Sequence, residues 1–181
     1  MLFRSKDVMI PAVLSLEPED LHLVRAAQGW LELGNPAEAE NELSGLHRDR
    51  GRHPDVLDVR WHIAGARLDW AAARDLGVRH VETAPGDARG WINRSNALHF
   101  LTQYLEAYRL LQPAAALFPK NDVIPYNMAC HLARLGQLEE AWRWLQESVS
   151  RSDPKTIRRR ALADADLEPL RKRILEELPG G

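Results

Sequence analysis

Cysteine is nearly absent from this sequence, since Cys130 is the only one. A single cysteine cannot form an internal disulfide, so we expect a fold that does not depend on oxidation and a reducing compartment. Long apolar runs are absent too: the stretch from Val8 to Leu16 is interrupted by Pro11, and no small-residue cleavage site follows it. No segment approaches the roughly 20 apolar residues that span a membrane. We therefore expect a mature N-terminus, a cytoplasmic protein and no membrane partner.

The sequence also lacks an excess of charge of one sign. Its formal net charge is −2 and its pI is about 6.4, which argues against non-specific binding of nucleic acid. The basic run Arg158 to Arg160 is followed by Asp164, Asp166 and Glu168, which offset it. Glycine loops that bind phosphate, Gly-x-Ser-x-Gly elbows and paired catalytic carboxylates are missing as well. These absences predict no nucleic-acid partner and no enzymatic activity.

The sequence does contain alanine at a fixed interval. The positions are Ala39, Ala73, Ala107 and Ala141, and the differences 73−39, 107−73 and 141−107 all equal 34. This interval is the length of a repeated helical hairpin, in which small residues let paired helices approach closely. The period therefore predicts an all-α chain built from tandem helix pairs.

The residue types around each alanine fit the same pattern. The third unit shows it best, with an aromatic residue, a small residue, a large residue, the phased alanine, a second large residue and a proline at Trp91, Ser95, Leu98, Ala107, Leu111 and Pro119. This pattern resembles the tetratricopeptide repeat. The resemblance implies a right-handed superhelical solenoid of antiparallel helix pairs that binds proteins.

Breaks in the pattern give the boundaries that we expect. A lead-in covers 1–19, four hairpins cover 20–53, 54–87, 88–121 and 122–153, and capping helices cover 154–181. The cap is expected because a repeat array exposes an apolar end that a terminal helix must cover. Within the first hairpin we expect the second helix to run to about Arg50, and within the third we expect Pro113 to kink or shorten its helix. Gly77 leaves a large-residue slot empty, which predicts distortion in the second hairpin.

The resemblance further implies that the first helices of successive hairpins line a concave groove, which takes an extended peptide or a partner helix. Steps of 34 residues then select the positions that face it. The candidate groove residues are Arg25, Gln28, Asp58, His62, Arg89, Ile92, Asn93, Asn96, Tyr126 and Asn127.

The candidates in the third and fourth hairpins carry the most useful chemistry. Asn93, Asn96 and Asn127 offer both donors and acceptors, which suits a peptide backbone. Asn96 with Asn127 resembles part of the carboxylate clamp of some tetratricopeptide co-chaperones, although Ile92 stands in the place of its lysine. A basic partner could come only from Lys155 or from Arg158 to Arg160. The alternative is that these amides only solvate the groove or satisfy helix ends.

No metal or cofactor is expected. His99 and His131 lie near Cys130, but no recognised ligand spacing joins them to a second cysteine or an acid. Among the six tryptophans, Trp70 and Trp144 fall outside the repeat core, and a partner or a second copy could cover them. The alternative function is therefore a structural or self-associating subunit, and a homodimer is possible.

Overall fold

The computed structural model describes residues 15–179, which form helices and no strand. Most of the predicted lead-in, residues 1–14, lies outside the described part. The elements are α1 (Pro18–Glu32), α2 (Pro36–Ser44), η1 (Arg48–Arg52), α3 (Pro54–Ala66), α4 (Trp70–Thr83), α5 (Ala88–Phe100), α6 (Tyr104–Leu117), α7 (Val123–Arg134), α8 (Leu138–Ser150), α9 (Pro154–Ala163), η2 (Ala165–Leu170) and α10 (Arg171–Glu177). None of these helices is long and apolar enough to cross a membrane. The predicted all-α fold is confirmed.

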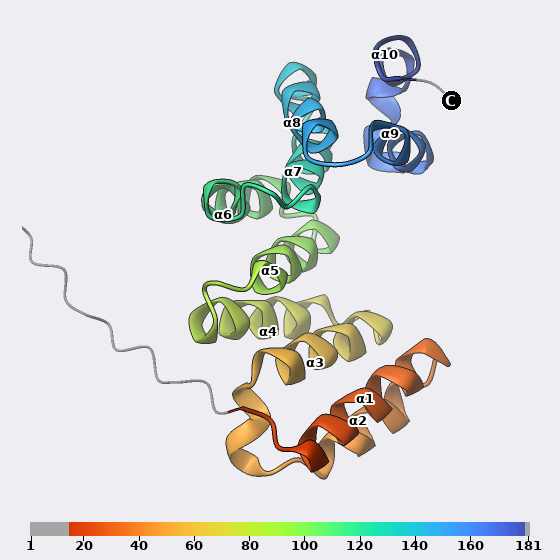
Figure 1. The fold of residues 1–181 in the computed structure, drawn as a ribbon. Coiled ribbons are helices and arrows are strands. Elements are labelled where there is room, and N and C mark those ends of the chain that lie inside the picture. Colours follow the sequence, from red (N-terminus) through yellow and green to blue (C-terminus); the bar gives the residue numbers. More distant parts are fainter. Residues whose placement is uncertain (1–14, 180–181) are drawn as a thin grey trace, which may run out of the picture.

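The helices pack as consecutive pairs that stack along the molecule (Figure 1). Each first helix contacts the first helix of the next pair, so that α1 touches α3, α3 touches α5 and α5 touches α7. Among the described residues, the second helices α2, α4, α6 and α8 have no comparable contacts with one another. The first helices therefore form the more tightly curved, inner row of the solenoid.

The phased alanines hold the pairs together. Ala39, Ala73, Ala107 and Ala141 are all fully buried, with 0% of their surface exposed. A methyl group at these positions lets the two helices of each pair approach without a void. The 34-residue period is thus a period of close helix contact.

The turns within the pairs repeat with the same period. Gly34, Leu68, Thr102 and Gly136 each have a positive φ, at 73°, 59°, 60° and 74°. Glycine adopts this left-handed conformation without a steric penalty, whereas Leu68 and the β-branched Thr102 adopt it under strain. The middle two turns therefore keep the geometry of the outer two at a cost in free energy.

Gly77 does not leave an empty slot, contrary to the prediction from its position. A Cβ atom on Gly77 would lie 2.6 Å from the Cα atom of Arg94 in α5. On the facing helix, a Cβ on Gly90 would lie 3.0 Å from His80 and from the backbone of Val81. The backbone of the neighbouring pair fills the space, so α4 and α5 pack closely rather than being distorted.

One predicted helix end is wrong, and for another helix the early end, one of two alternatives expected at Pro113, does not occur. The second helix of the first pair ends at Ser44 and not near Arg50, and the 3-10 turn η1 follows it. In the third pair, α6 continues through Pro113 to Leu117. Pro113 is exposed, so its ring faces solvent and the helix tolerates the one missing N–H donor.

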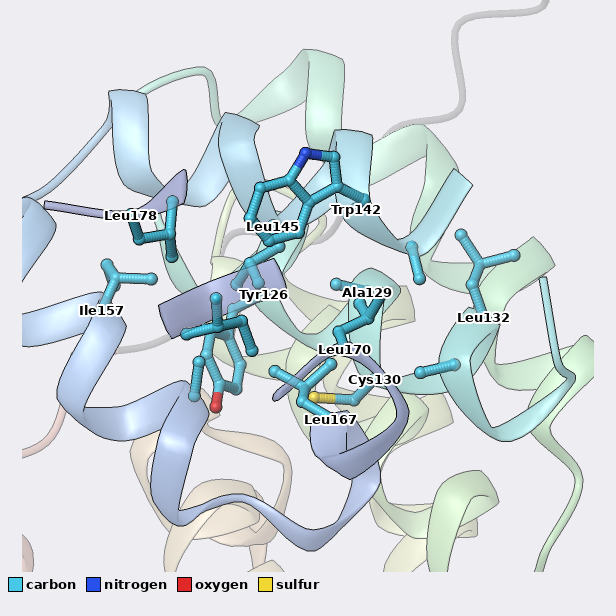
Figure 2. Close-up of a cluster of buried hydrophobic side chains, with 14 residues drawn as sticks. Tyr126, Ala129, Cys130, Leu132, Trp142, Leu145, Ile157, Leu167, Leu170 and Leu178 are labelled. Atoms are coloured by element: carbon cyan, nitrogen blue, oxygen red, sulfur yellow. The ribbon is translucent and has the colours of Figure 1, made fainter. Parts of the chain in front are cut away.

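The segment after α8 folds onto the last pair. Leu167 and Leu170 are buried in one cluster with Tyr126 and Trp142 (Figure 2), and Ile174 belongs to the same cluster. Every residue of α7 from Ile124 to Ala133 is buried, and Ile124 and Met128 pack in a separate cluster with Leu111 and Ala114 of α6. We call residues 154–178 the tail; it closes the apolar end of the solenoid.

Candidate binding groove

The inner row of helices carries the predicted groove residues, and the structure separates all of them except Ile92, which packs against the cluster of Leu111 and Met128, into three sets. Arg25, Gln28 and His62 are exposed on α1 and α3. A second set surrounds Arg89, and a third set lies where α5, α7 and the tail meet. The second and third sets form hydrogen-bonded networks, whereas the first is open to solvent.

Arg89 joins the second and third pairs. Its guanidinium lies 2.8 Å from Asp55, 3.6 Å from Asp58 and 2.7 Å from Asp87. The amide of Asn93 donates a hydrogen bond of 2.7 Å to Asp58. Because these donors are already used between helices, this set stabilises the stacking of the pairs.

The carboxyl group of Asp87 shows how strong that network is. Burial by itself would raise the pKa of Asp87, but hydrogen bonds from Arg89 and His80 outweigh it and lower the pKa to about 2. Nε2 of the buried His80 lies 3.0 Å from the carboxylate. Asp87 also caps α5 by accepting a hydrogen bond from the backbone N–H of Arg89.

The third set surrounds a polar cavity of about 210 Å³. The amide of Asn127 donates a 2.8 Å hydrogen bond to Asn96, and both side chains line the cavity. The guanidinium of Arg160, from α9, stacks 3.7 Å from the centre of the Tyr126 ring. This arrangement places a basic group of the tail beside the two amides, at a position that the sequence had offered as one of several.

Two carboxylates of the tail line the same cavity, and neither was predicted as a groove residue. Asp164 accepts a 2.9 Å hydrogen bond from the hydroxyl of Tyr126, and Asp166 lies 3.1 Å from Nε2 of His99. Arg134 lies 3.7 Å from the other oxygen of Asp166. Asp164 also caps η2 through the N–H of Asp166, at 3.0 Å. An aspartate at a helix start is a recognisable cap in a sequence, so Asp164 could have been predicted as the start of η2.

A line of polar side chains runs from this cavity into the interior. Nδ1 of His99 lies 3.1 Å from Nδ1 of His131, and Nε2 of His131 lies 2.7 Å from the hydroxyl of Ser95. Ser95 in turn lies 3.3 Å from the carbonyl oxygen of Ala107. Burial, and then the neighbouring His99, lower the pKa of His131 to about 3.

Burial also shifts the other titratable groups at the cavity. It lowers the pKa of His99 and raises the pKa of the Cys130 thiol well above its usual value, and Asp164 and Asp166 raise the latter further. Burial likewise raises the pKa of Tyr126. At neutral pH, His131 is therefore uncharged, and Cys130 and Tyr126 keep their protons.

The outer face has a different hollow, of about 600 Å³, between α6 and α8. Trp144 lines it and is half-buried, packed against the two buried clusters that contain Trp142 and Leu111. Trp70 is half-buried too, but the exposed ring of Phe100 stacks on it at 3.9 Å. The chain thus partly covers both tryptophans itself.

These features define a helical-repeat solenoid whose C-terminal end is closed by its own tail. No protein-family model and no curated protein matches the chain. Solved structures do resemble it: a MamA variant titled "MamA RS-1 ArsTM double mutant" has a TM-score of 0.67 at 17% identity, over 90% of this chain and 92% of that one. MamA from Desulfovibrio magneticus RS-1, from residue 41 to its end, has a TM-score of 0.66 at 18% identity, over 90% and 96%. MamA is a tetratricopeptide-like repeat protein, so the likeness confirms a fold of that kind; the division into four repeats rests on the sequence period.

Proposed function

We propose that the chain is a non-catalytic interaction module that binds a peptide or helix of a partner protein along its inner row of helices. The cavity between α5, α7 and the tail carries this proposal. It is polar, it lies on the inner row, and it combines two amides with the guanidinium of Arg160. Amides and guanidinium groups together suit the backbone and a carboxylate of an extended peptide.

The surrounding contacts favour a preformed site. The stacking on Tyr126 holds Arg160 over the cavity, and Tyr126 is itself fixed through Asp164. No hydrogen bond or ion pair within the described residues uses the guanidinium donors of Arg160. A ligand therefore finds donors that are already oriented, which reduces the entropy lost on binding.

The exposed residues nearer the N-terminal end extend the same row. His62 on α3 and Arg25 with Gln28 on α1 are exposed, and Ile92 on α5 is half-buried. A peptide anchored at the cavity would pass over these side chains as it continues toward α1. They would supply the selectivity for its sequence.

The alternative is a structural subunit that associates with a second copy or a larger complex through its outer face. The half-buried Trp144 in the hollow between α6 and α8 supports it. The two functions place binding on opposite rows of helices, so variants of each row separate them.

We would select peptides from a random library on the immobilised protein and measure their Kd by fluorescence polarisation. Two lost hydrogen bonds, each contributing about 0.5–1.5 kcal/mol, should raise Kd roughly tenfold or more in the Asn96→Ala, Asn127→Ala double variant. Gln146→Ala on the exposed face of α8 is the control and should leave Kd within about twofold. Unchanged Kd in the double variant together with loss in Trp144→Ala would contradict the proposal and favour the alternative.

A further inference from the structure

The tail carries two basic runs, and only one of them is neutralised by neighbouring acids. Arg171, Lys172 and Arg173 in α10 each form an ion pair with a glutamate of the tail, at distances of 2.8–3.9 Å. On α9, Lys155 and the run from Arg158 to Arg160 form no ion pair within the described residues. The tail therefore contains two sets of similar cations that differ in their counter-charges.

The three acids that follow α9 in the sequence contact other groups. Asp164 accepts hydrogen bonds from the hydroxyl of Tyr126 at 2.9 Å and from the backbone N–H of Asp166 at 3.0 Å. Asp166 forms an ion pair of 3.7 Å with Arg134, and Glu168 pairs with the second basic run. None of the three forms an ion pair with α9, so the charges that offset one another in the sequence are not paired in the fold.

The cations of α9 face solvent. The helix lies at the C-terminal end of the solenoid, against α8, and contains no acid (Figure 1). Lys155, Arg159 and Arg160 are exposed. Asp153, which precedes the helix, caps it by accepting hydrogen bonds from the N–H and the hydroxyl of Thr156. Lys155 and Arg159 lie one turn apart and repel each other, so an anionic partner would stabilise this surface.

The same helix borders the cavity. Arg160 lines the cavity together with Asn96 and Asn127, and its guanidinium lies 3.7 Å from the centre of the Tyr126 ring. A peptide that fills the cavity therefore meets the basic surface as it leaves. From Lys155 to Arg160 the helix rises about 7.5 Å, which two or three residues of an extended peptide span.

The two amides at the cavity indicate which part of a peptide lies there. One hydrogen bond of 2.8 Å joins Asn127 to Asn96. Whichever way the two amide groups are oriented, this bond leaves an acceptor on one residue and at least one donor on the other. The N–H and C=O of a peptide group need this combination, whereas a chain-terminal carboxylate offers acceptors only. The amides therefore suit an internal stretch of backbone, and the carboxylates left for α9 are those of side chains.

We propose that the partner segment is acidic, and that α9 recognises its aspartate or glutamate side chains. The backbone lies on Asn96 and Asn127, the nearest carboxylate pairs with Arg160, and the next ones pair with Arg159 and Lys155. Guanidinium groups suit this role because they bind carboxylates through two parallel hydrogen bonds. This proposal rests on the proposed function, because it names the chemistry of the peptide that the cavity binds.

A short acidic segment fits this surface better than a nucleic acid does. The basic surface is limited to a helix of 10 residues, the second run of the tail is neutralised, and the chain has a net charge of −2. Nucleic acids bind through phosphate contacts that extend over a larger basic field. Two or three carboxylates match the exposed cations of α9.

The test uses the full-length protein and peptides selected on it from a random library whose members end in a C-terminal amide. We expect the selected peptides to be enriched in Asp and Glu. For the tightest one, a neutral form with Asn and Gln in place of these acids should have a Kd roughly tenfold higher or more, because several modest ion pairs are lost together. The Kd is measured by fluorescence polarisation of the fluorescein-labelled peptides at low ionic strength, where screening is weak.

Paired variants locate the acidic side chains on the protein. Lys155→Gln with Arg159→Gln should raise the Kd of the acidic peptide roughly fivefold or more, and should leave the Kd of its neutral form within about twofold. As a control, Arg171→Gln with Lys172→Gln removes as many charges from the paired run of α10, and should leave the Kd of both peptides within about twofold. Circular dichroism establishes that each variant is folded.

Unchanged affinity of the acidic peptide for the α9 variant would overturn the proposal, and so would equal losses in the α9 and α10 variants. Selected peptides that lack acids but still depend on Asn96 and Asn127 would overturn it too, while the proposed function would stand. Tighter binding of a single-stranded oligonucleotide of about 12 residues than of the acidic peptide would assign the surface to nucleic acid instead. If no selected peptide depends on Asn96 and Asn127, the proposed function itself fails.

Discussion

Two junctions of this solenoid are built in opposite ways. Between α4 and α5, Gly77 and Gly90 remove side chains so that one helix lies against the backbone of the other. Between α7 and the tail, large side chains such as Leu167 and Leu170 fill the interface (Figure 2). Helix pairs of the same repeat length therefore accommodate both kinds of packing. The first junction should be sensitive to added atoms and the second to removed atoms.

The largest effect is expected from Leu167→Ala at the tail junction. Leu167 is fully buried, and a cavity left by such a truncation typically costs about 2–5 kcal/mol of the free energy of unfolding. Urea denaturation followed by circular dichroism measures the loss. Leu175→Ala in α10 is the matched control, because half of Leu175 is exposed, and it should cost no more than about 0.5 kcal/mol. Equal effects of the two variants would show that the tail does not unfold together with the repeats.

Gly77→Ala tests the other junction by adding a single methyl group. Its Cβ would lie less than 3 Å from the backbone of α5, so the helices must separate, and we expect a loss of about 1–3 kcal/mol. Gly29→Ala in α1 makes the same substitution where nothing lies within 4 Å. There the better helix propensity of alanine should raise the stability by up to about 1 kcal/mol. Effects of the same sign in both variants would rule out close packing as the reason for Gly77.

The smallest effect concerns the turns, which look alike in both halves of the molecule. Leu68→Gly relieves a left-handed conformation that costs roughly 1–2 kcal/mol, but glycine loses more backbone entropy on folding, so we expect a net gain of about 0.5–1 kcal/mol. The side chain of Leu68 is 73% exposed, so little burial is lost. Gly136→Ala, the reverse change at an equivalent turn, should destabilise by about 1 kcal/mol. A fall in the urea midpoint for Leu68→Gly would mean that this side chain makes contacts that offset its strain.

The fold was predictable from the sequence because its determinants repeat. The phased alanines fix the distance between paired helices, and each turn lies at a constant offset from them. Gly77 was misinterpreted because the residue that fills its slot is the backbone of Arg94, which belongs to the next pair. The residue pattern of a single repeat does not include residues of the next repeat, so it could not predict this contact. The end of the second helix at Ser44 was missed because nothing between Ser44 and Arg50 breaks a helix as strongly as proline does.

The candidate site was predictable only in part. Steps of 34 residues found Asn96, Tyr126 and Asn127, which do lie at one cavity. They could not find Asp164 and Asp166, because the period ends near Ser150 and the tail follows no repeat that would relate it to His99 or Cys130. Its placement depends on three-dimensional packing, through the apolar side chains that bury it against α7.

The position of the tail in the chain also sets the order in which the cavity is assembled. Three of its lining residues, Arg160, Asp164 and Asp166, follow all the helix pairs in the sequence. During synthesis the pairs are made first and can begin to fold, since each relies mainly on its neighbours. This wall of the cavity is then added after the helix pairs, so a nascent chain passes through a stage in which the solenoid is present and its cavity is still open on one side.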